Sequence, residues 1–118
     1  SLHDALPILE NKDNFGKDKN KVYLFGLELK DVKPEKFQVM KEPITEKIIY
    51  VRDENNLFVI FYDYFSGFNF VKTKKFENID FETLKWKSAR ELEDKNGKYI
   101  VNGSVIDEDK IEIKFIKK

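Results

Sequence analysis

The 118-residue chain contains no cysteine, and its single histidine is His3, close to the first residue. Without cysteine there is no disulfide, no thiolate nucleophile and no cysteine-ligated zinc site. Beyond His3 there is no histidine for base catalysis, for a serine triad or for a metal cluster. Carboxylates can act as acid and base, but none of the 22 acidic residues stands out. We therefore predict that the protein is not an enzyme and uses no cofactor and no metal ion.

The chain also lacks an excess of either charge and has no long apolar run. Lysine and arginine number 22, and aspartate and glutamate number 22, so the net charge is zero. Nucleic-acid binding depends on an excess of cations against phosphate, and this balance argues against such a partner. No apolar stretch approaches the roughly 20 residues that cross a bilayer as a helix, so no membrane span is predicted.

Residues 1–10 match nothing further along the chain, which does not begin with methionine. We expect them to be a non-native leader, either translated sequencing-adapter or a remnant of cloning, and residues 11–118 to form a single domain. The alternative is a native strand or helix cut from a longer protein. If the leader is an artefact, a signal peptide is lost with the true start.

One short phrase occurs three times in the chain. It reads aspartate, charged residue, asparagine, turn residue, variable position, aromatic, over residues 18–23, 53–58 and 94–99. An aspartate that opens a turn accepts hydrogen bonds from backbone N–H groups two or three residues on. Asparagine or glycine later in the turn tolerates a positive φ. Each phrase is therefore predicted to form a β-hairpin tip, with these structural turn residues: Asp18, Asn20, Asp53, Asn55, Asp94, Asn96 and Gly97.

The phrases resemble the DKNYY repeat family, whose units follow the pattern Tyr-Ala-Lys-Asp-Lys-Asn-x-Val-Tyr-Tyr-x-Gly. Tyr50-Val51-Arg52 and Gly26 match parts of that pattern. Residues 34–40 and 80–84 match its trailing element, a proline or aspartate followed by Phe-x-x-Leu. The resemblance covers residues 15–106 and implies a bacterial protein, with no catalytic residues to transfer. The second unit departs from the pattern because it lacks the glycine.

The residue pattern predicts an all-β antiparallel domain of repeated hairpins, a meander forming a twisted sheet or open roll. Residues 57–65 are apolar on both faces, which indicates a central strand covered on both sides. Two short helical turns are expected, at 34–40 and at 80–84. Asn102-Gly103 predicts a two-residue hairpin between 99–101 and 104–106. Residues 111–116 are expected to form a charge-protected edge strand.

Three features admit a binding interpretation. The Asp-x-Asn phrases suggest calcium, but no copy has both the glycine and the glutamate that an EF-hand loop needs, so turn formation is preferred. Lysines 72, 74, 75, 85 and 87 suggest a basic face, although intervening acidic residues favour a solvated strand edge. The aromatics between 58 and 70 are expected to form core, with a binding platform as the alternative. The possible binding aromatics are Tyr62 and Tyr64.

From these observations we predict a non-catalytic structural or protein-interaction module, and the resemblance suggests the bacterial cell envelope as its location. Two alternatives stay open. One is a carbohydrate- or ligand-binding module that uses exposed aromatics, and the other is a toxin-neutralising immunity protein. The expected partner is another protein or a glycan.

Overall fold

The computed structural model describes residues 14–41, 47–63, 70–104 and 110–118. Within these ranges the chain forms eleven strands and no helix. The N-terminal sheet contains β1 (Phe15–Lys17), β2 (Val22–Leu24) and β3 (Leu27–Glu28). The central sheet contains β4 (Gln38–Lys41), β5 (Ile48–Arg52), β6 (Leu57–Asp63) and β7 (Phe70–Lys75). The C-terminal sheet contains β8 (Lys85–Ser88), β9 (Glu91–Asp94), β10 (Gly97–Asn102) and β11 (Glu112–Lys117).

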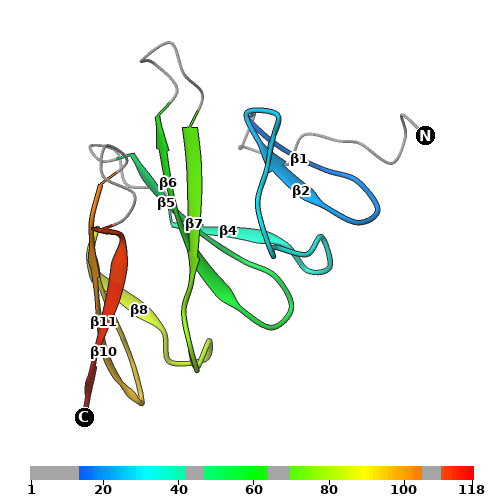
Figure 1. The fold of residues 1–118 in the computed structure, drawn as a ribbon. Coiled ribbons are helices and arrows are strands. Elements are labelled where there is room, and N and C mark those ends of the chain that lie inside the picture. Colours follow the sequence, from blue (N-terminus) through cyan, green and yellow to red (C-terminus); the bar gives the residue numbers. More distant parts are fainter. Residues whose placement is uncertain (1–13, 42–46, 64–69, 105–109) are drawn as a thin grey trace.

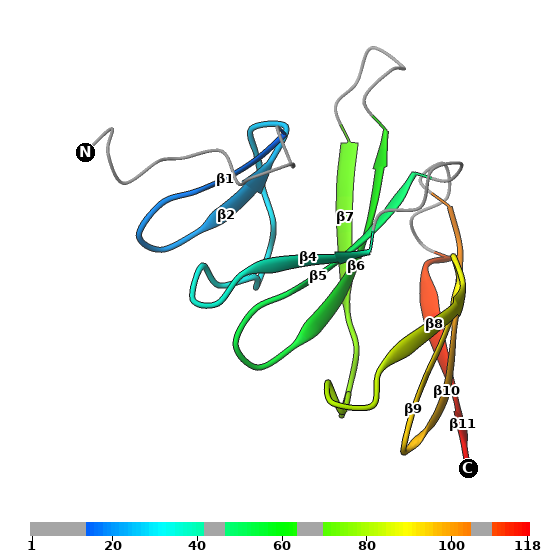
Figure 2. The same cartoon turned by 180° about the vertical axis from the view of Figure 1, so that it is seen from behind.

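All paired strands are antiparallel neighbours in sequence, so the all-β antiparallel prediction is confirmed. The expectation of one twisted sheet or an open roll was wrong, because the strands form three open sheets. The central sheet lies between the other two (Figures 1 and 2). Two hydrophobic cores result, one on each face of the central sheet. The apolar residues on both faces of β5 and β6 are the physical reason, since both faces must be removed from water.

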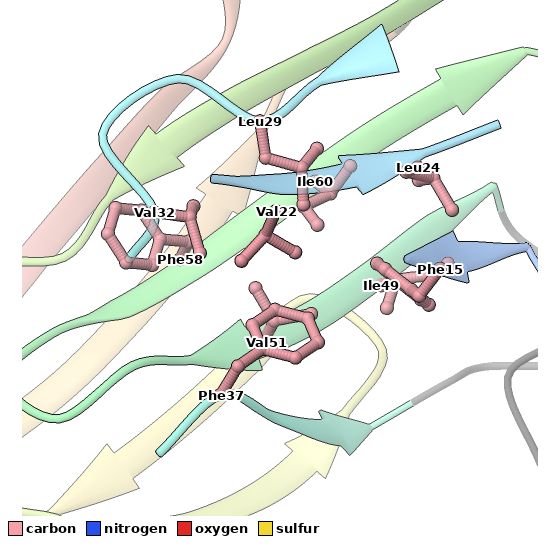
Figure 3. Close-up of a cluster of buried hydrophobic side chains, with 10 residues drawn as sticks. All are labelled: Phe15, Val22, Leu24, Leu29, Val32, Phe37, Ile49, Val51, Phe58 and Ile60. Atoms are coloured by element: carbon pink, nitrogen blue, oxygen red, sulfur yellow. The ribbon is translucent and has the colours of Figure 1, made fainter. Parts of the chain in front are cut away.

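β6 shows how one strand serves both cores. Phe58 and Ile60 join the core shared with the N-terminal sheet (Figure 3), whereas Val59 and Phe61 join the core shared with the C-terminal sheet. Side chains alternate between the two faces of a strand, and residues 57–61 are all at most 1% exposed. Full burial of each such side chain contributes about 1.5–3 kcal/mol. The prediction of a central strand covered on both sides is confirmed.

The two expected helical turns were wrong. At 34–37 the N–H of Phe37 donates to the carbonyl of Pro34 at 3.2 Å, which closes a single turn. Lys36 there has a φ of 55°, a left-handed conformation that cannot continue a right-handed helix. At 80–84 the Asp80 carboxylate accepts a hydrogen bond from the N–H of Thr83 at 3.2 Å, and β8 begins directly afterwards. Both connectors are therefore turns that redirect the chain from one sheet to the next.

Two glycines lie in connections of different geometry. Phe25 and Gly26 have φ values of 53° and 78° and connect β2 to β3 as a two-residue hairpin. Asn102 and Gly103 do not form a hairpin with the residues that follow, because Asn102 is the end of β10 and pairs with Glu112 of β11. The expected position of the last strand at a sheet edge is confirmed.

Two sequence predictions fall on residues outside the described ranges. They are the leader at 1–10 and the binding role of Tyr64. No helix in the described part of the chain has the length and hydrophobicity needed to cross a membrane.

Candidate functional site

The three turn aspartates make the same pair of hydrogen bonds. Oδ1 of Asp18 accepts from the backbone N–H groups of Asn20 and Lys21, both at 2.8 Å. Oδ1 of Asp53 accepts from the N–H groups two and three residues on, at 3.0 and 2.9 Å. Oδ1 of Asp94 does the same at 2.8 and 3.2 Å. One carboxylate oxygen thus holds each hairpin tip by the side-chain-to-backbone mechanism that favours aspartate in turns.

The second oxygen has a different partner in each copy. Oδ2 of Asp18 accepts from the Tyr23 hydroxyl at 2.9 Å. The hydrogen bonds from Asn20 N–H, Lys21 N–H and this hydroxyl lower the pKa of Asp18. Oδ2 of Asp53, whose copy has a phenylalanine in place of the tyrosine, accepts instead from a backbone N–H, that of Lys33, at 3.1 Å.

Asp94 combines both kinds of partner. Its Oδ2 accepts from the N–H of Asp80 at 2.9 Å and from the Tyr99 hydroxyl at 3.2 Å. The pKa of Tyr99 is raised to about 12. Burial of the phenol is the largest cause, and the negative charge of Asp94 and the hydrogen bond to it add to the effect. Asp53 and Asp94 are each 2% exposed. Both oxygens of every turn aspartate are therefore engaged in holding the fold.

A cleft of about 590 Å³ opens between the edge strand of the central sheet, β7, and the edge strand of the C-terminal sheet, β11. This volume lies in the range of small-ligand sites. The lining residues come from both strands, from the connector after β7 and from the third hairpin: Lys74, Lys75, Glu77, Asn78, Asn96, Tyr99, Ile113 and Phe115.

The apolar wall of the cleft comes from β11. Ile113 and Phe115 face the central sheet, and the Phe115 ring lies 4.9 Å from the Tyr99 ring. Phe115 nevertheless keeps 47% of its surface exposed, and Ile116, on the opposite face of the strand, keeps 44%. These two are the large hydrophobic side chains that the described part of the chain leaves exposed.

The cationic wall explains why the cleft stays open. Lys74 pairs with Val59, so both point toward the C-terminal sheet, where Lys74 meets the apolar side of β11. An ammonium group is not buried against apolar side chains without a partner, so the two edge strands do not close over each other. At the other interface the rings of Phe25 and Tyr62 are 5.6 Å apart, and both pack against the first core.

The third hairpin tip positions both walls of the cleft. The buried Tyr99, held by Asp94, supports the Phe115 ring from behind. Nδ2 of Asn96 donates to the carbonyl of Asn78 at 3.1 Å, which fixes the rim below β7. Two further bonds tie the same connector to this tip, from Asp80 N–H to Asp94 and from Lys95 N–H to Thr83 Oγ1. The cleft is thus preorganised by the turn phrase.

The cleft carries unpaired charge. Within the described ranges neither Lys74 nor Lys75 has a carboxylate within 4.0 Å, and Glu77 has no cation at that distance. Lysines elsewhere on the C-terminal sheet do pair, as Lys98 does with Glu91 at 3.3 Å. Lys75 pairs with Phe58 of the first core, so its side chain leaves β7 on the opposite face, and Lys74 is the ammonium group that β7 directs into the cleft. Lys117 lies on the same face of β11 as Phe115, so two ammonium groups stand at the cleft against the carboxylate of Glu77.

The residues that the sequence suggested for binding lie in different parts of the structure and do not form one site. Tyr62 is half-buried against the first core, and Tyr64 lies outside the described residues. The suggested basic face is divided, because Lys74 lines the cleft whereas Lys85 pairs with Glu93 on the far side of the C-terminal sheet. Sequence reasoning did not single out Phe115. The alternating pattern of the last strand could have identified it, because that pattern puts Phe115 on the same face as Ile111 and Ile113.

These features define an all-β protein of stacked antiparallel sheets whose hairpins close on aspartate-centred turns. The chain belongs to the DKNYY family, whose family model matches residues 3–118, essentially the whole chain. This match confirms the resemblance found in the sequence. Comparison with curated proteins and with solved structures yields no match.

Proposed function

We propose that the chain is a non-catalytic protein-interaction module that binds its partner at β11 and the adjacent cleft. The observation that carries this proposal is the pair of half-exposed side chains, Phe115 and Ile116, on an edge strand beside a preformed cleft. Exposed apolar surface rimmed by polar residues is typical of interaction sites. The turn aspartates support the non-catalytic part, because hydrogen bonds within the fold occupy both of their oxygens.

The proposal includes a repeated unit as the scaffold for this surface. Its support is the identical Oδ1 hydrogen bonding at Asp18, Asp53 and Asp94. The central and C-terminal sheets also share a strand order. Their first strand pairs shift register at matching places, between Val39 and Lys41 and between Trp86 and Ser88. In this interpretation β11 belongs to the last of three stacked copies and presents its edge to a partner.

Photo-crosslinking tests the proposed surface. A photoreactive amino acid replaces Ile116 in one variant and Lys19, an exposed residue in the first hairpin turn, in a control variant, and both are irradiated in the producing cells. We expect one discrete cross-linked protein from position 116 and none from position 19. No cross-link from 116, or the same products from both positions, contradicts the proposed surface.

A second candidate is carbohydrate binding, and Phe115 favours it too. A half-exposed ring stacks against the apolar face of a sugar, and the amides of Asn78 and Asn96 lie on the rim of the same cleft. A glycan array tests this candidate directly. Carbohydrate binding is supported if a neutral glycan binds saturably and Phe115→Ala abolishes this binding while the circular dichroism spectrum is unchanged. If no glycan on the array binds, carbohydrate binding is excluded as the function.

A further inference from the structure

We propose that the cleft between β7 and β11 binds an acidic, extended segment of a partner protein, with one apolar side chain of the segment inserted against Phe115. This inference rests on the proposed function and names the chemistry of its partner. It follows from three properties of the cleft: its apolar wall, its surplus of cations and the free edge of β11.

The apolar wall has room for one inserted side chain. Phe115 and Ile113 present apolar surface to the cleft, and Phe115 is 47% exposed. The ring is supported by Tyr99, which is itself 2% exposed and hydrogen-bonded to Asp94, so little ordering is required when a ligand arrives. Covering this wall with an apolar side chain removes both surfaces from water.

The charge of the cleft selects an acidic partner. Lys74 points into the cleft and Lys117 lies on the same face of β11 as Phe115, with Glu77 as the acidic lining residue. None of the three is in an ion pair within the described ranges. The whole chain has zero net charge, so the surplus is a local property of this site. Carboxylates of a bound segment complement it, which gives specificity and a faster association.

The strand edge favours an extended peptide over a compact ligand. β11 is the terminal strand of its sheet, with β10 on one side and no described strand on the other. Its outer edge presents backbone N–H and C=O groups next to the cleft, and an extended segment can pair with them. Lys114 and Lys117 on β11, against Glu112, again favour acidic side chains on the incoming segment.

Fluorescence anisotropy with three labelled heptapeptides tests the proposal on the full chain. The first carries a central phenylalanine flanked by three acidic residues on each side. In the second, lysines replace the acidic residues, and in the third, serine replaces the phenylalanine. We expect the first to bind, with affinity that falls as salt is raised, and each of the others to bind about tenfold more weakly or not at all.

Variants of the chain test whether the first peptide binds in the cleft. Lys74→Glu and Phe115→Ala are expected to weaken the first peptide about tenfold. The matched controls are Lys87→Glu, at an exposed lysine of β8, and Phe25→Ala, at a half-buried ring on the side of the N-terminal sheet. Both controls should leave the affinity unchanged. Circular dichroism confirms that all four variants are folded.

The outcomes separate this inference from the proposed function. Equal binding of the lysine peptide, or an equal loss in the Phe25→Ala control, overturns the cleft assignment. If no peptide binds while position 116 still cross-links to one protein, the acidic segment is wrong and the interaction module stands. If no peptide binds and the cross-link is also absent, both proposals fail.

Discussion

At the scale of single residues, the three turn aspartates differ in the partner of the second carboxylate oxygen. At Asp18 that partner is a tyrosine hydroxyl, which can rotate to accept a hydrogen bond as well as donate one. At Asp53 and Asp94 it includes a backbone N–H, which can only donate. The same substitution therefore has different consequences in the three copies.

Asparagine at these positions separates the two cases. Asp53→Asn and Asp94→Asn keep one oxygen for the turn but place an amide N–H₂ against a backbone N–H in a buried site. We expect each to lower the free energy of unfolding by about 1–3 kcal/mol in urea titrations. Asp18→Asn should leave the urea midpoint nearly unchanged, because the Tyr23 hydroxyl can reverse. An equal loss at all three positions contradicts this account.

The raised pKa of Tyr99 makes stability depend on pH in the alkaline range. The folded state holds the phenol proton to about pH 12, whereas the unfolded phenol titrates near its ordinary pKa of 10.0. The stabilisation is thus complete below pH 10 and is lost as the pH rises from 10 to 12. Tyr99→Phe lacks this titration. We expect its stability deficit relative to wild type to shrink between pH 9 and 11 in urea unfolding, and a constant deficit contradicts the assignment.

At the scale of elements, β11 leaves no room for a side chain at Gly97 of β10. A Cβ atom there would lie 2.3 Å from the carbonyl oxygen of Ile116, a backbone atom that cannot move away cheaply. A Cβ atom on Gly16 in β1 would meet nothing within 4 Å. Neither glycine has a positive φ, so the comparison isolates the clash from backbone strain.

We therefore expect Gly97→Ala to cost about 1–3 kcal/mol of unfolding free energy, the usual range for forced overpacking. Gly16→Ala, the matched control, should cost little. Because Gly97 pairs with Lys117 of β11, the alanine should also speed amide hydrogen exchange along that strand. Unchanged exchange in β11 would show that the strand adapts without loosening.

The sequence predicted well those elements whose conformation depends on residues close together in the chain. The alternation and double-sided hydrophobicity of β6, and the turn chemistry of the three phrases, depend on residues a few positions apart. The connectors were mispredicted because their conformation depends on distant partners. Asp80 donates its N–H to Asp94, and Lys33 to Asp53, so each connector is shaped by the hairpin that follows it. The hairpin predicted at Asn102-Gly103 failed for the same reason, since β11 occupies the edge of β10.

At the scale of the whole molecule, the outer face of the C-terminal sheet differs from the inner faces of the stack. The central sheet presents Tyr50, Leu57 and Val59 to the C-terminal sheet. Counted from the turn aspartate, the same positions in the C-terminal sheet carry Glu91, Lys98 and Ile100. Glu91 and Lys98 form an ion pair at 3.3 Å on the face directed away from the core. That face has the polar character of a terminal layer in stacked proteins.

Introducing apolar residues at this face should make two copies of the chain stack through it. We expect the double variant Glu91→Tyr, Lys98→Leu to self-associate at micromolar concentration, measured by sedimentation velocity, because it copies Tyr50 and Leu57 of the central sheet. The control, Glu35→Tyr with Lys19→Leu, adds the same hydrophobicity at exposed positions in turns. Association of both variants would mean that hydrophobicity alone is responsible, and the face has no special role.

The sequence by itself determined the family, the all-β class and the aspartate turns, because each of these depends on residue types within a short stretch. Only the tertiary structure decided that the strands divide into three stacked sheets. It alone also brought Lys74 and Phe115 to opposite walls of one cleft, although they are far apart in the chain. The physical reason is that packing between sheets is set by which faces must be covered and by how each connector turns. Neither is encoded in the pattern of a single strand.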